Sequence, residues 1–188
     1  MFFLNPFALA AAGGDFESIA TVTVGSGGAS YLDFTSIPSG YQHLQIRAIL
    51  RSVYTNEVQS AIGIRLGSAG SLDTGSNYAY HGLYGDGASA LAYAGASQSQ
   101  GNPGLTPAST ATASVFSASV IDILDYGSTS KAKTIRTFNG VDRNGGGQVR
   151  VTSSLWTSTS AVDTIRITEY NGQTYAQYST AALYGVKS

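Results

Sequence analysis

The sequence predicts an all-β fold: an antiparallel β-sandwich with jelly-roll connections and an extended N-terminal anchor segment. Three observations support this. Apolar and polar residues alternate with a period of two in several segments, convincing helical periodicity is absent, and turn-forming dipeptides separate the segments. We therefore divide the 188 residues into an apolar anchor and spacer at 1–17 and one β-sandwich domain at 18–188.

The clearest predicted strand covers residues 43–53, where Leu44, Ile46 and Leu50 share one face. The same alternation gives three more strands an apolar face, formed by Ile62, Ile64 and Leu66, by Val149, Val151 and Leu155, and by Ile165 and Ile167. Six further strands are expected at 19–24, 31–37, 78–84, 115–124, 133–139 and 181–186. About ten strands at this spacing are typical of a sandwich or barrel, whose core closes between two sheets.

Glycine-rich turn signals separate the predicted strands. Residues 25–28 join the first two, and the strongest dipeptides are Asp86-Gly87, Asn139-Gly140 and Asn171-Gly172. Residues 88–114 have a weaker pattern, with a turn expected at 101–104. This long segment is either a surface excursion or an extended arm laid against a neighbouring molecule, and its lack of charge favours the arm.

The composition is poor in charge and excludes several classes of function. Charged residues make up 11% of the chain, against about 25% in a typical soluble domain, and the net charge is -1. Since the chain has no cysteine, disulfides and thiolate zinc sites are excluded. The absence of a basic surplus argues against nucleic-acid binding. A weakly charged surface is typical of an extracellular β-domain, or of a subunit covered by its own copies or by other partners.

The N-terminal segment is apolar and is predicted to dock into a partner. Its large apolar residues are Phe2, Phe3, Leu4, Phe7 and Leu9. Small residues at 10–14 follow, as expected of a spacer between an anchor and a body. The segment is too short to span a membrane, which takes about 20 apolar residues. The alternative is that these side chains pack on their own domain.

No residue pattern predicts a catalytic centre, a metal site or a cofactor. His43 and His81 lack a nucleophile elbow and sufficient companion ligands. Asp122 and Asp125 could act as paired carboxylates of a polysaccharide-degrading enzyme. However, two residues that are three positions apart point to opposite sides of a strand. An arginine-pairing or turn-capping role is the stronger interpretation, and we expect a protein that is not an enzyme.

Aromatic residues offer a second kind of contact. Tyr78, Tyr80 and Tyr84 share one face of a predicted strand, and Trp156 ends another. Exposed tyrosines suit interfaces because they combine a large contact area with a low entropy cost. These four side chains are therefore candidates for an interface or for glycan contact. The alternative is that they form part of the core.

Several segments resemble small β-rich virion structural proteins of tailed bacteriophages. They are residues 36–47 (Ser-Ile-Pro-Ser-Gly-Tyr-Gln-His-Leu-Gln-Ile-Arg), 77–78, 81–87, 122–123, 125–126, 131–134, 155–156 and 179–187. The resemblance spans about 30–187 and does not include the N-terminal segment. It implies a non-enzymatic accessory subunit of the tail, the adsorption apparatus or the capsid surface.

The resemblance also implies partners and a location. The partners would be other virion proteins and further copies of the chain, with a trimer among the expected assemblies. The location would be the virion, assembled in the host cytoplasm. A carbohydrate-binding module that recognises a host surface glycan through tyrosine and tryptophan is the alternative function.

Overall fold

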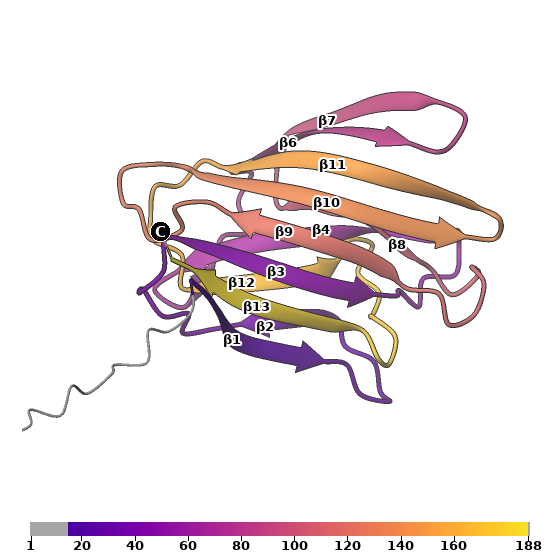
Figure 1. Cartoon of the computed structure of the whole chain (residues 1–188), viewed down its shortest axis with the longest axis horizontal. Helices are drawn as coiled ribbons and strands as arrows, with labels where there is room; N and C mark the ends of the chain where they lie inside the picture. The colour runs from indigo at the N-terminus through magenta and orange to yellow at the C-terminus, as the bar shows by residue number, and fades with distance from the viewer. Residues whose placement is uncertain (1–14, 188) are drawn as a thin grey trace, which may run out of the picture.

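A computed structural model describes residues 15–187, which form thirteen strands and no helix. All paired strands run antiparallel, which confirms the predicted all-β, antiparallel architecture (Figure 1). The strands are β1 (Phe16–Thr23), β2 (Tyr31–Phe34), β3 (His43–Leu50), β4 (Gln59–Ser68), β5 (Ser71–Leu72), β6 (Tyr78–Gly85), β7 (Ala90–Gln98), β8 (Gly101–Pro107), β9 (Ser117–Ile123), β10 (Lys133–Arg143), β11 (Gly146–Trp156), β12 (Thr164–Glu169) and β13 (Thr180–Val186).

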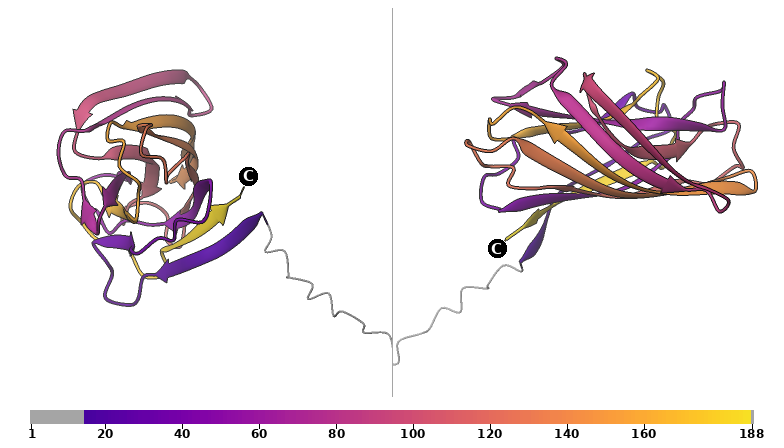
Figure 2. Two further views of the ribbon diagram at one scale, coloured as in Figure 1. Left: turned by 90° about the vertical axis from the view of Figure 1, so that its left-hand side faces the viewer. Right: turned by 90° about the horizontal axis from the view of Figure 1, so that it is seen from above.

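The strands form two sheets of unequal size. The large sheet has the order β1-β13-β3-β9-β10-β11-β6-β7. The small sheet has the order β2-β12-β4-β5, and β8 also pairs with β4. The small sheet lies behind the large one in Figure 1, and the strongly curved large sheet wraps around it when the molecule is seen end-on in Figure 2.

The core lies between the two sheets and is made by the predicted alternation. The large sheet contributes Leu44, Ile46, Ile121, Ile123 and Ile135, and the small sheet contributes Leu32, Ile62, Ile64, Leu66, Ile165 and Ile167, each at most 1% exposed. Such burial stabilises by about 25 cal/mol for each Å² of apolar surface removed from water. A shift of one residue in any strand would turn its whole apolar set to solvent, so the alternation also sets the register.

One predicted strand buries the face opposite to the one that we expected. The pattern gave β11 an apolar core face at Val149, Val151 and Leu155, but these residues are exposed, and the alternate set of Thr152, Ser154 and Trp156 is buried. The reason is the close approach of β8. An added Cβ at Gly101 would lie 3.3 Å from Ser154, so only small side chains fit between the two strands.

Of the three strongest turn dipeptides, one lies inside a strand and another forms a turn outside any hairpin. Asn139-Gly140 lies inside β10, where the buried Asn139 side chain donates to Leu105 O (3.0 Å) and to Ser119 Oγ (2.9 Å). Asn171-Gly172 forms a turn, but it does not join neighbouring strands of a hairpin. The β10–β11 hairpin instead turns at residues 144–145, where Gly145 has a φ of 82°. Asp86-Gly87 joins β6 to β7 as predicted.

The charge-free segment 88–114 is part of the sandwich. It contains β7 and β8, and all seven residues of β8 are buried, so the predicted turn at 101–104 is wrong. The arm is laid against its own chain because Gly101 and Gly104 allow a close approach to Ile64 and Asn139. The following loop is held by Arg51, whose guanidinium donates to Thr112 O and Val115 O, both at 2.8 Å.

The β6–β7 hairpin extends the large sheet past the small one, as both figures show. Tyr93 lies across Gly82, and Tyr80 lies across Gly95, each ring covering the glycine directly opposite on the neighbouring strand. Aromatic rings that cover cross-strand glycines restore packing that the glycines lack. The hairpin is therefore held mainly by its own side chains and by β11.

We predict that Gly185→Ala destabilises the fold. The ring of Tyr41 lies across Gly185, and an added methyl group would overlap it close to the backbone. The free energy of unfolding in urea should fall by about 1–3 kcal/mol. Gly146→Ala is the matched control, since this strand glycine has nothing within 4 Å and should change stability little. Equal effects of the two substitutions would contradict the packing described here.

Candidate functional site

The outer face of the large sheet, which is the side turned away from the core, is apolar and exposed. Its large apolar side chains are Ile49 (54% exposed), Leu83 (65%), Val120 (37%), Phe138 (57%), Val149 (53%) and Val151 (52%). Single exposed apolar residues are normal on soluble proteins, but a contiguous group marks an interaction site. This face is the strongest candidate for a functional surface in residues 15–187.

The register of the sheet joins these residues into two continuous rows. The first row runs through Arg47, Val120, Phe138, Val151, Leu83 and Ala92 on β3, β9, β10, β11, β6 and β7. The second row runs through Ile49, Ala118, Gly140, Val149, Gly85 and Ala90 on the same strands. Directly opposed residues share one face of an antiparallel sheet, so the rows form a single surface.

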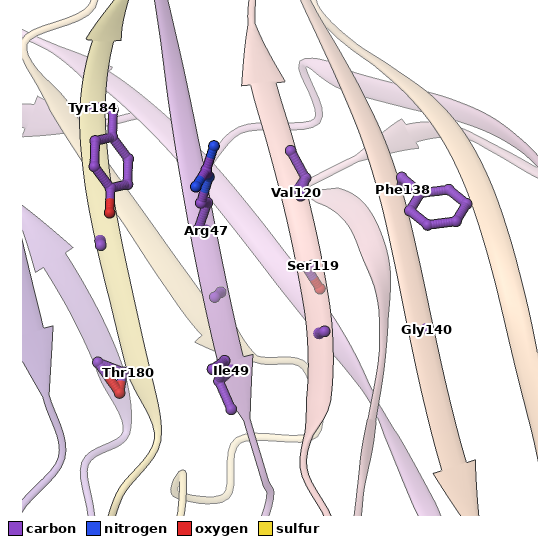
Figure 3. Close-up of a pocket in the computed structure, with 11 residues that line it drawn as sticks. Arg47, Ile49, Ser119, Val120, Phe138, Gly140, Thr180 and Tyr184 are labelled. Atoms are coloured by element: carbon purple, nitrogen blue, oxygen red, sulfur yellow. The ribbon is translucent and has the colours of Figure 1, made fainter. Parts of the chain in front are cut away.

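One part of the outer face is hollowed. The hollow has a volume of about 560 Å³. Ala118, Gly140 and Ala182 leave room at its centre, and larger side chains surround it. Figure 3 shows Tyr184, Arg47, Val120 and Phe138 standing in succession across β13, β3, β9 and β10, with Ile49 beside them. The outer face therefore carries both projecting apolar side chains and a space that could receive one.

Polar groups border the two rows. Asp122 forms an ion pair with the Arg136 guanidinium (2.9 Å) and accepts from Gln45 Nε2 (2.9 Å). The Arg47 guanidinium carbon lies 5.1 Å from the ring centre of Phe16 and 5.4 Å from that of Tyr184. Such an apolar centre with a polar rim is the usual anatomy of a protein interface.

The predicted aromatic contacts divide into two groups. Tyr78 (1% exposed) and Trp156 (2%) lie in the core with their rings stacked, so neither can contact a partner at the surface. Tyr80 and Tyr84 are half-buried on the opposite side of the sheet from the outer face and flank Tyr93. These two therefore remain accessible candidates. Phe2, Phe3, Leu4, Phe7 and Leu9 lie outside the described residues.

The side chain of Arg150 packs against two of the half-buried tyrosine rings. The Arg150 guanidinium carbon lies 4.8 Å from the ring centres of both Tyr84 and Tyr93. Tyr93 Oη also makes a 2.5 Å hydrogen bond with Thr152 Oγ1. The rings are thus fixed by packing, by a cation–π contact and by a hydrogen bond. These contacts support the hairpin, and the rings remain partly exposed.

The two aspartates considered for hydrolysis have separate partners. Asp122 pairs with Arg136, whereas Asp125 pairs with Lys131 (2.6 Å) and accepts from Gln42. Hydrogen bonds from Lys131 and Gln42 hold the pKa of Asp125 below its usual range. His43 Nδ1 accepts from the Asp125 backbone N–H at 3.0 Å. In residues 15–187 no three His, Asp or Glu side chains gather as a metal site would require.

A smaller polar pocket lies on the outer side of the small sheet. It measures about 210 Å³ and is lined by Tyr31, Arg65, Arg166 and Glu169, among others. Arg166 forms a bidentate pair with Asp33 (2.7 and 2.6 Å) and lies 3.6 Å from the ring centre of Tyr31. The two arginines oppose each other across β4 and β12. The pocket is polar and partly neutralised, in contrast to the apolar outer face.

Comparison with known proteins identifies no relative of the chain. No protein-family model, curated protein or solved structure matches the chain. Among residues 15–187 there is also no helix of the length and hydropathy that crossing a bilayer requires.

We predict that Asp73 supports the buried Trp156. Trp156 Nε1–H donates to Asp73 Oδ2 at 2.7 Å. Burial raises the pKa of Asp73, but hydrogen bonds from Trp156, Asn77 and Gly75 together lower it further, so the net shift is downward. Asp73→Ala should therefore reduce the free energy of unfolding by about 1–3 kcal/mol at neutral pH.

The pH dependence gives a second readout. A lowered pKa in the folded state means that this stability is present above the unfolded pKa of about 3.9 and is lost as the pH falls through the folded value. The difference between wild type and Asp73→Ala should shrink in acid, as followed by the fluorescence of the single tryptophan. Asp142→Ala, at an exposed position, is the control. A difference that persists unchanged at low pH would contradict this role.

Proposed function

We propose that the chain is a non-enzymatic structural component of a tailed-phage virion, an accessory subunit of the tail, the adsorption apparatus or the capsid surface. The observation that carries the proposal is the apolar outer face of the large sheet. Two rows, small or apolar except for Arg47 at one end, cross six strands there, with Phe138 and Leu83 more than half exposed. A surface of this kind is stabilised by contact with other proteins.

The proposed body is a jelly roll, and the strand order supports this. Within the large sheet, β1-β13-β3-β9 are neighbours, and β2-β12-β4-β8 are neighbours in the small sheet. Numbered one to eight along the chain, these strands have the order 1-8-3-6 in one sheet and 2-7-4-5 in the other, which is the arrangement that two rolled Greek keys produce. The β6–β7 and β10–β11 hairpins then extend one sheet. Jelly rolls are frequent in viral capsid proteins.

The proposed attachment is through the N-terminal segment. The described chain begins beside the C-terminal end, where Lys187 N donates to Asp15 O (2.8 Å). Lys187 Nζ also pairs with Glu17 Oε1 (2.5 Å), which fastens β1 to the end of β13. Phe16 and Glu17, assigned to the spacer from sequence, lie in β1. An apolar segment attached to this firmly held edge strand could dock into a partner without disturbing the sandwich.

We predict that the full chain is incorporated into particles of the phage whose genome encodes it. A tagged copy, supplied during phage growth, should band with the particles in a density gradient. A copy without residues 1–14 should keep its circular dichroism spectrum and melting temperature, because the described strands begin at Phe16, but should lose incorporation.

The experiment tests the virion role and the anchor role separately. A full chain that is absent from purified particles would overturn the virion role. A shortened chain that enters particles at the wild-type level would overturn the anchor role of Phe2, Phe3, Leu4, Phe7 and Leu9 while leaving the virion role in place. A shortened chain that unfolds would assign these side chains to their own core.

Glycan binding is a second candidate function, and the half-buried tyrosines favour it. Tyr80 and Tyr84 flank Tyr93 on the β6–β7 hairpin, and Arg150 lies over the rings of Tyr84 and Tyr93. Aromatic rings and arginine are common contacts for sugars. The rings are also needed to cover Gly82 and Gly95, so a structural role competes with this function.

We predict that, if glycan binding is the function, Tyr84→Ala abolishes binding on a glycan array while particle assembly is retained. The control is Tyr178→Asn, which removes a 70% exposed ring from a loop at a positive φ that asparagine tolerates. Binding that survives Tyr84→Ala, or that is lost equally in both variants, would remove the tyrosine cluster from consideration.

A further inference from the structure

We infer that the partner on the outer face is a second copy of the same chain, packed sheet against sheet. This inference deepens the proposed function, since it rests on the same apolar surface and names its occupant. Three properties of the face support a second copy: its shape, its size and its lack of charge.

The shape is self-complementary. Phe138 is 57% exposed and stands on β10 at the side of the hollow, whose small lining residues include Ala118, Gly140 and Ala182. Each copy therefore carries a projecting ring and a space for one. When the same patch meets itself about a two-fold axis, each projecting group can enter the hollow of the other copy, and both contacts form at once.

The size fits the centre of a stable interface. Six strands spaced about 4.8 Å apart, with two rows along each strand, cover roughly 400 Å². A standard stable interface buries about 800 Å² on each partner, of which somewhat more than half is apolar. The two rows supply most of that apolar centre. Gln45, Asp122, Arg136 and His81, in the adjacent row, supply a polar rim.

The charge pattern favours a partner with an uncharged surface. Arg47, at one end, is the single charged residue among the twelve positions of the two rows. A charged partner would lose hydration here without gaining an ion pair. The same face on a second copy lacks charge over an equal area, and a net charge of -1 produces little repulsion between copies.

The test is the mass of the full chain in solution, measured by light scattering during size-exclusion chromatography. The wild type should elute at twice the chain mass of 19.4 kDa, or at a higher multiple. Leu83→Asp places a carboxylate on the outer face and should raise the dissociation constant about tenfold or more. Phe138→Ser, which adds no charge, should weaken association in the same direction.

Leu91→Asp is the matched control. Leu91 is 45% exposed and is the cross-strand partner of Tyr84 on β7. It therefore shares the face of Tyr84, which is the side of the hairpin turned away from Leu83 and the outer face. It should leave the mass unchanged, and unchanged melting temperatures would show that all variants fold. A monomeric wild type, or an oligomer that Leu83→Asp and Phe138→Ser leave intact, would overturn the inference.

Particle incorporation separates this inference from the proposed function. A monomeric chain that still enters particles would mean that the outer face meets a different virion protein, so the second copy would be wrong and the virion role would stand. A chain that self-associates through Leu83 but is absent from particles would support the second copy and overturn the virion role.

Discussion

The packing of the small sheet against one face of the large sheet is the interaction on which the rest of the structure depends. Isoleucine and leucine side chains such as Ile46, Ile64 and Ile121 exclude water from both layers at once. A sheet has two faces, however, and the smaller layer covers only part of one of them. The exposed outer face and the uncovered β6–β7 hairpin are consequences of this difference in size between the two sheets. The apolar residues that they carry belong to no core of the described chain.

The three buried charged side chains of residues 15–187 hold loops of the sandwich in place. Lys133 is fully buried and donates to the carbonyl oxygens of Ser128, Lys131 and Thr159, while Arg51 donates to the loop that follows β8. Glu169 is buried and accepts from Ser52 (3.1 Å) and from the backbone of Gln173 (2.9 Å). Satisfied buried charges of this kind fix loops in place, because leaving them unpaired would be costly. The central rows of the outer face are left almost free of charge.

Alternation identified most strands but not the side of the sheet that each would bury. In β3, Leu44 and Ile46 point inward as expected. In β11 the same pattern led to the opposite outcome, because the buried side holds Ser154, next to Gly101 of β8, and Thr152, which hydrogen-bonds to Tyr93. A period of two marks two faces and favours the apolar one as buried. It carries no information about a second sheet that excludes larger side chains, nor about an apolar face that stays exposed.

The sequence by itself determined the all-β class, most of the strand positions and the scarcity of charge, since these depend on residue types and on spacing along the chain. The tertiary structure alone decided that β8 is buried, that Trp156 and Tyr78 belong to the core, and that Phe138, Val151 and Leu83 come together. These three residues are far apart in the chain, and only the cross-strand register brings them into one row. The candidate surface is therefore a property of strand pairing, which local patterns do not encode.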